Sequence, residues 1–138
     1  MSNVIIYTSP TGGVSVCVPT GEISIEDVQR RDIPPGVTSY IVSRSTLPEE
    51  DGDFFNAWEQ SRGVVTVNIE KAKALTKDRL RAERVPLLAA QDVAFQRALE
   101  TGADTTAIVA EKQRLRDVPY LADACTTTAE LRALKAAA

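Results

Sequence analysis

The side chains that most often carry enzyme chemistry are scarce in this chain of 138 residues. Histidine, the commonest general base and a common transition-metal ligand, is absent. The two cysteines, Cys17 and Cys125, lie far apart without metal-ligand spacing, so we expect free, buried thiols in a reducing compartment. Ser-His and Cys-His catalysis are excluded. We therefore predict a non-enzymatic protein with no cofactor and no metal site.

Two further motifs could in principle bind a ligand. The run Thr11-Gly12-Gly13 resembles part of a phosphate-binding loop, but the lysine and the helix that complete such a loop are missing, so a hairpin turn explains it. The second motif is a group of four carboxylates whose spacing differs from the alternating ligand positions of an EF-hand. We expect these four to form a solvated acidic loop: Glu49, Glu50, Asp51 and Asp53.

A basic stripe follows one side of the helix predicted after residue 68. At about 100° per residue, four basic side chains share this side. A solvated helix face, a contact with an acidic protein partner and a contact with nucleic-acid phosphate could each explain it. Acidic residues are interspersed, the net charge is -3 and no stacking aromatic residues accompany the stripe, so nucleic acid is the least favoured partner. The basic stripe consists of Lys73, Lys77, Arg81 and Arg84.

The elements of the first half predict a small antiparallel sheet. Residues 3–9 and 14–19 are rich in β-branched side chains and flank a turn with proline and glycine, which is typical of a hairpin. A short helix should start at Ser24 as its N-cap and end before the two prolines that follow Asp32. We also expect a strand at 39–43, a helical turn at 54–58 whose aromatic rings cover the sheet, and a strand at 64–67.

The composition changes at Asn68, a predicted helix N-cap. Residues 1–68 carry four basic and nine acidic side chains, whereas residues 69–138 carry twelve and ten. We predict an α+β fold with two domains, in which a small antiparallel sheet module (1–68) precedes a helical segment (69–138). The helical segment is a long helix kinked or broken at Pro86, a hairpin and a short last helix. The expected ranges are 69–85, 87–101, 104–117 and 127–136.

The apolar stripe of helix 69–85 is too thin to stabilise the helix alone in water. We therefore expect this helix to pack against another chain. The predicted interface combines the thin stripe with the basic stripe on the opposite side. The thin stripe consists of Ala72, Leu75, Arg79 and Ala82, and the basic stripe of Lys73, Lys77, Arg81 and Arg84.

Asp92 is unusual because it falls in an apolar seam formed by Leu88, Phe95 and Leu99. A carboxylate that loses its hydration there needs a partner. We predict an ion pair with Arg84 or Arg114; the alternative is that the seam is hydrated at this point.

Much of the chain resembles a group of small tail proteins of tailed bacteriophages. The resemblance is carried by VNIEKAKALTKDRLRAERVPLLAAQDVAFQRALE, by the later KQRLRD run and by the N-terminal YTSPTGGVSV, DIPPGV and TLPEEDGDFFNAWE stretches. Gln91 departs from the leucine that is frequent in this family, which makes the seam beside Asp92 wetter. The matching positions of the central motif are Arg81, Arg84, Pro86, Leu87, Leu88, Asp92, Val93, Arg97, Ala98, Leu99 and Glu100.

The resemblance implies a virion component of the phage tail, made in the bacterial host cytoplasm. Its partners would be other tail proteins (fibre, baseplate or tail tip), and it would be a homo-oligomer in the assembly. The first hypothesis is a structural or adaptor protein that links tail or baseplate components to fibres. The alternative is a tail-fibre assembly chaperone that is absent from the mature virion. No apolar run approaches the roughly 20 residues of a membrane-spanning helix, so a membrane partner is not expected.

Overall fold

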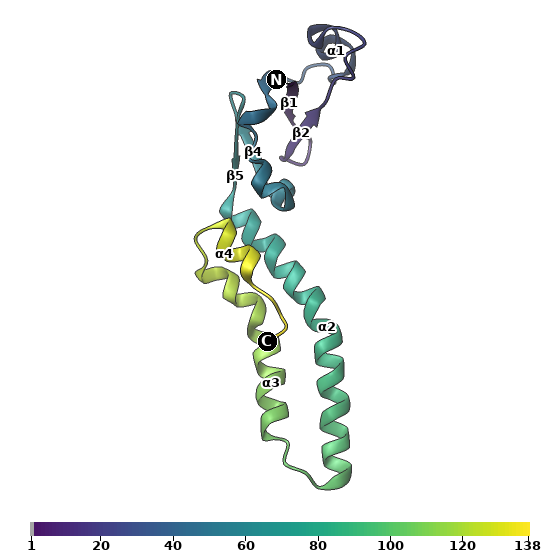
Figure 1. Cartoon of the computed structure of the whole chain (residues 1–138), viewed down its shortest axis with the longest axis vertical. Helices are drawn as coiled ribbons and strands as arrows, with labels where there is room; N and C mark the ends of the chain where they lie inside the picture. The colour runs from purple at the N-terminus through teal and green to yellow at the C-terminus, as the bar shows by residue number, and fades with distance from the viewer. Residues whose placement is uncertain (1) are drawn as a thin grey trace. The chain divides into compact units, whose positions relative to one another are not determined.

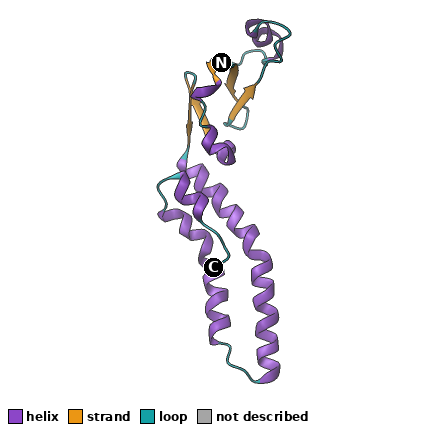
Figure 2. Cartoon of the chain, viewed as in Figure 1, coloured by secondary structure: helices purple, strands orange, loops and turns teal. Residues whose placement is uncertain are grey.

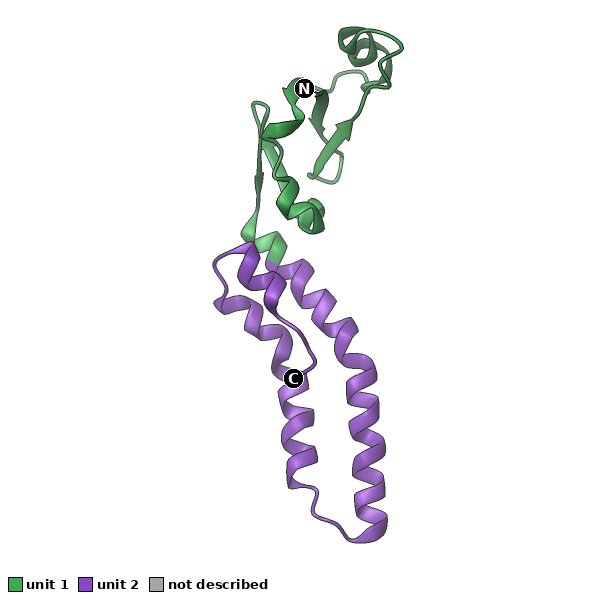
Figure 3. Ribbon diagram, in the orientation of Figure 1, with its two compact units in different colours: residues 1–72 green, residues 73–138 purple. Residues whose placement is uncertain are grey.

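The computed structural model describes residues 2–138 and has the expected α+β fold, with strands first and helices later (Figures 1 and 2). The chain forms two compact units, one up to Ala72 and one from Lys73 to Ala138 (Figure 3). The boundary falls in the first turn of a long helix. Each unit is described by itself below.

The first unit contains a three-stranded antiparallel sheet of order β2-β1-β3. Its strands are β1 (Asn3–Thr8), β2 (Val14–Cys17) and β3 (Ser39–Ser43). The Ser9 amide donates to the Gly13 carbonyl at 2.8 Å and closes the turn between β1 and β2, which confirms the predicted hairpin. Helix α1 (Ile25–Asp32) begins after Ser24, whose hydroxyl accepts from the Asp27 amide at 3.2 Å as predicted.

A second, two-stranded sheet follows, made of β4 (Trp58–Ser61) and β5 (Val64–Val67). Strand β4 was not expected, because its polar residues show no alternation and its partner β5 defines it. Two residues, Arg62 and Gly63, join the strands with φ angles of 52° and 84°, the conformation of a hairpin turn that matches the strand twist. Two 3₁₀ segments precede β4: η1 (Arg44–Thr46) and η2 (Glu49–Ala57).

The core of the first unit lies between the sheets and η2. Trp58 is buried, and its indole N–H donates to the Asp51 carbonyl at 3.2 Å, so the acidic loop supplies a backbone acceptor to the core. Phe55 is 40% exposed and contacts Trp58 edge to face with ring centroids 4.9 Å apart. The other buried members of this cluster are Val4, Ile6, Val14, Leu47 and Val65.

Helix α2 (Ile69–Thr101) is a single helix that continues through Pro86 and bends along its length (Figure 1). Of the two alternatives expected at Pro86, a kink or a break, the break is wrong because the helix is continuous. Asn68 caps the helix as expected, because its side-chain oxygen accepts from the Lys71 amide at 3.1 Å. Pro86 and the Ala82 carbonyl that it displaces belong to exposed residues, so water can replace the lost hydrogen bond.

Three elements follow α2: α3 (Thr106–Asp117), the 3₁₀ segment η3 (Val118–Ala124) and α4 (Thr128–Ala133). Helix α3 starts later than the predicted residue 104, because the Asp104 carboxylate accepts from the Thr106 amide and hydroxyl just before the helix. The last helix is shorter than the predicted 127–136, although Thr127 and Glu130 form the expected capping box. None of the helices within residues 2–138 combines the length and the apolar character that crossing a membrane requires.

We predict that Gly63→Ala destabilises the first unit by about 1–2 kcal/mol, because an L residue is strained at this positive φ. A Cβ there would also lie 3.3 Å from the Tyr40 Cβ. Urea unfolding followed by the fluorescence of the single tryptophan, Trp58, measures the change. Gly52→Ala is the control, since no heavy atom lies within 4 Å of its added Cβ. Equal midpoints for the two variants would contradict the prediction.

Candidate interaction surface of the helical unit

The basic stripe of α2 is largely used inside the second unit. The Lys77 ammonium lies 2.6 Å from the Asp123 carboxylate and 5.8 Å from the Tyr120 ring centre. Arg84 donates to the carbonyl oxygens of Leu115 and Arg116, at 3.3 and 2.8 Å.

These two carbonyls belong to the last turn of α3, where Pro119 provides no amide hydrogen and the helix dipole favours a cation. Arg84 therefore caps α3. Of the other stripe members, Lys73 donates to the Asp123 carbonyl, whereas Arg81 is exposed and pairs with Asp78 on its own helix.

A contact of helix 69–85 with another chain stays a prediction, but the helix is not uncovered within its own chain. Its inner face is covered by the chain's own C-terminal elements, so that Leu80 and Thr76 are almost fully buried. Leu80 packs with Val118 and Ala136 in one apolar cluster, flanked by Leu87 and Leu134.

The inner face of α2 lies between the two predicted stripes. Ala72 and Arg79 of the thin stripe border it on one side, and Lys77 and Arg84 of the basic stripe border it on the other. Four-carbon lysine stems and a threonine extend the narrow apolar row there, which is why the helix needs few large apolar side chains. The predicted interface residues of the thin stripe therefore differ in burial. Ala72 is buried and Leu75 and Arg79 are half-buried, whereas Ala82 is exposed.

Three charged residues bind the segment that follows α4, and a fourth orients one of them; we call the four the clamp. Arg79 donates to the carbonyls of Leu131 and Leu134, at 3.1 and 2.9 Å. The Glu83 carboxylate accepts from the Ala136 amide at 3.0 Å, and Arg114 donates to the Ala136 carbonyl at 2.9 Å. Two ion pairs orient these side chains, Arg79 with Glu83 and Arg114 with Glu111. The clamp consists of Arg79, Glu83, Glu111 and Arg114.

The clamp shifts the pKa values of its own members. The Ala136 amide, followed by the Arg79 guanidinium, holds the pKa of Glu83 below its ordinary value. Hydrogen bonding from Arg114 likewise lowers the pKa of Glu111, and Glu111 raises the pKa of Arg114. Both carboxyl groups therefore favour the ionised form that the clamp requires.

Asp92 does not pair with Arg84 or Arg114, so that prediction is wrong. Its carboxylate lies 2.7 Å from the Lys112 ammonium of α3 and remains 63% exposed. The Lys112 ammonium also lies 5.1 Å from the centre of the Phe95 ring. Arg84 and Arg114 instead bind backbone carbonyls. The partner of Asp92 is therefore the lysine that lies across the hairpin, Lys112.

The outer half of the α2–α3 hairpin exposes apolar side chains. Between residues 89 and 110 only Ala98 is buried, because no third element covers this part of the helix pair. Leu99, which the seam interpretation placed inside, is 61% exposed, and Val93 is 52% exposed. Sequence reasoning missed the exposure of Leu99 because this residue continues the core-like spacing of Leu88 and Phe95. Together with Val85, which precedes this part of α2, these exposed apolar residues of the hairpin are called the hairpin surface: Val85, Val93, Leu99 and Val109.

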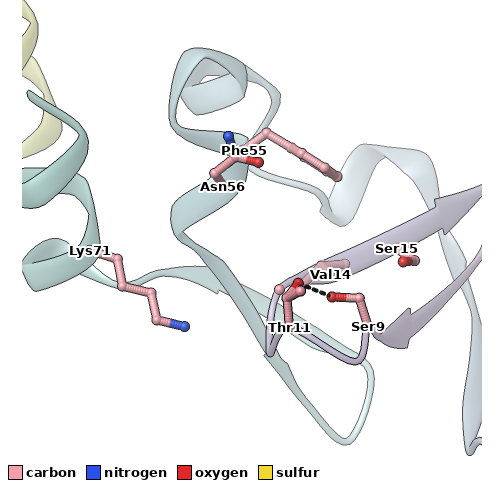
Figure 4. Close-up of a pocket in the computed structure, with 8 residues that line it drawn as sticks. Ser9, Thr11, Val14, Ser15, Phe55, Asn56 and Lys71 are labelled. Carbon is pink, nitrogen blue, oxygen red and sulfur yellow. Dashed lines mark hydrogen bonds between the residues drawn. The ribbon is translucent and has the colours of Figure 1, made fainter. Parts of the chain in front are cut away.

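The first unit contains a hollow of about 450 Å³ beside the β1–β2 turn (Figure 4). Ser9 and Thr11 share a hydrogen bond of 2.9 Å at its edge, and the Lys71 side chain extends toward the turn (Figure 4). Lys71 is paired with Glu59 at 2.7 Å, which lowers the pKa of Glu59. The hollow is lined by hydroxyl groups and by a lysine that is ion-paired with a carboxylate. Neither feature activates a hydroxyl group as a nucleophile.

Both cysteines are free thiols, as predicted. Cys125 is buried and Cys17 is half-buried. Burial raises the pKa of Cys125, so its thiolate is disfavoured. Within residues 2–138 no three side chains of histidine, cysteine, aspartate or glutamate gather as metal ligands.

No protein-family model, curated protein or solved structure was found to match this chain.

We predict that Glu83→Gln makes the second unit less sensitive to acid. A carboxyl whose folded pKa is lowered stabilises the fold above its unfolded pKa, and this contribution disappears as the pH falls through the lowered value. The variant should be less stable than the wild type at about pH 6, and the difference should shrink at about pH 3. Urea midpoints of the two proteins, measured by circular dichroism at each pH, give the difference in stability.

Glu100→Gln, which removes the same charge from an exposed residue of α2, is the matched control and should show neither effect. If Glu83→Gln and the control behave alike, the carboxylate does not hold the segment.

Proposed function

We propose that this chain is a non-enzymatic structural or adaptor protein of a bacteriophage tail, which links tail or baseplate components to fibres through protein–protein contacts. The resemblance to small phage tail proteins supplies the biological setting. The observation that carries the proposal is the hairpin surface, since an exposed apolar set on a helix pair is typical of a protein contact.

The residues of the resemblance divide into two groups in the structure. Some build the hairpin: Arg84 caps α3, Leu87 packs beside Leu80, and Ala98 is buried. Others, including Val93 and Leu99, are exposed and contribute little to the fold of one chain. A binding role accounts for this second group.

The hairpin surface alone is too small for a stable complex. Burying one such side chain contributes about 1.5–3 kcal/mol, and four together are comparable with the cost of association, roughly 4–15 kcal/mol. We therefore expect these residues to form the centre of a larger interface with a polar rim. Charged neighbours such as Arg97 and Glu100 are placed to contribute to that rim.

We predict that Val93→Asp reduces the amount of this protein in purified phage particles at least tenfold, because the charge cannot be buried in an apolar contact. The folded content, measured by circular dichroism, should stay unchanged, since Val93 is exposed. Quantitative mass spectrometry of particles from a complementation assay measures the incorporation. Ala129→Asp, which places the same charge on the exposed first turn of α4, is the matched control and should be incorporated normally.

Normal incorporation of Val93→Asp would exclude the hairpin surface as the contact. Absence of the wild-type protein from mature particles would contradict the adaptor and support the assembly-chaperone alternative.

A further inference from the structure

The segment that follows α4 is bound by the rest of the second unit in the way that a peptide ligand is bound. Leu134 leaves the helix with an extended backbone, at φ -69° and ψ 137°. Ala136 then has both of its backbone hydrogen-bonding groups engaged, the amide by Glu83 and the carbonyl by Arg114. The segment pairs with no strand.

All of the clamp's hydrogen bonds to this segment reach backbone atoms. Arg79, Glu83 and Arg114 contact carbonyl oxygens or an amide, which every residue except proline provides. Contacts of this kind give affinity without reading the sequence.

Selectivity comes from two side chains of the segment. Ala136 is fully buried beside Leu80 and Val118, so a larger residue does not fit at this position. Leu134 is half-buried against the same cluster, and Lys135 between them is exposed. The site therefore accepts leucine, then any residue, then a small residue.

Another peptide can replace this segment in its site. Each clamp side chain keeps about a third of its surface exposed, so water competes for the hydrogen bonds that these side chains make to the segment. Ala136 adds the burial of one methyl group. A segment of the same pattern from another protein could form the same backbone bonds, so exchange involves no loss of specific contacts.

We infer that the clamp and its apolar floor (Leu80, Leu87 and Val118) form a docking site for an extended Leu-x-Ala segment of a partner protein. Residues 134–136 occupy this site in the free chain and are displaced on binding. The inference goes beyond the proposed tail function and does not depend on it.

The test compares peptide binding by full-length variants. The probe is an acetylated hexapeptide with the sequence of residues 133–138, and backbone NMR shifts near the clamp report binding. Ala136→Glu places a charge in the buried position beside Glu83 and should expel the chain's own segment. Removal of this tethered competitor should tighten binding of the probe at least tenfold relative to the wild type.

Ala137→Glu alters an exposed residue and should bind the probe as the wild type does. Adding Glu83→Gln to Ala136→Glu should weaken binding of the probe again. A folded Ala136→Glu variant that binds no better than the wild type would overturn the inference, as would equal binding of a hexapeptide with glutamate at the Ala136 position.

A second measurement uses the unmodified protein and remains decisive if Ala136→Glu unfolds. The Ala136 amide should exchange with deuterium at least tenfold faster than the Leu80 amide, because the segment opens without unfolding of α2. Equal exchange rates would show that the segment leaves only on global unfolding, and would overturn the inference.

Discussion

The second unit depends on arginine side chains that satisfy the backbone carbonyls at the ends of short elements. Arg84 supplies donors to the last turn of α3, and Arg79 does the same at the end of α4. A helix of six residues such as α4 has too few internal hydrogen bonds to persist alone. Its capping box at one end and Arg79 at the other fix it on α2, and α4 then places Leu131 in the core.

This constraint explains the composition of the helical segment. Many of the basic residues that make this segment more positive than the first half donate hydrogen bonds to other parts of the same unit. They let a helix with a narrow apolar row become the centre of its unit, because Arg79, Arg84 and Arg114 each bind a backbone carbonyl and leave their stems for packing. The surface without such an internal role is the outer half of the hairpin, and this is where binding to another protein is proposed.

Local chemistry made part of the structure predictable. The hairpin turn and the caps at Ser24, Asn68 and Thr127 depend on groups within four residues, so the sequence displays them directly. The change from strands to helices near Asn68 was also visible, because helix formers replace the β-branched pattern there. Pro86 does not break α2, although it lies in the helix interior, where proline costs about 3 kcal/mol. The Ala82 carbonyl that loses its hydrogen bond belongs to an exposed residue, and packing of the inner face keeps the helix continuous.

Long-range choices were not predictable. Strand β4 exists because β5 pairs with it, and the inner face of α2 was decided by elements 40 to 60 residues later in the chain. The partner of Asp92 followed from a competition that the sequence does not show, since both arginines bind carbonyls. The clamp was not predicted for a related reason: its partners in the segment are backbone atoms, which leave no side-chain pattern in the sequence.

Because its own C-terminal elements cover α2, we expect the helical unit to fold without a second chain. Thermal unfolding of the isolated protein, followed by circular dichroism from about 1 to about 100 µM, tests this expectation. One midpoint for the helical signal is expected at all concentrations. A midpoint that rises with concentration would contradict it, because stability would then come from association.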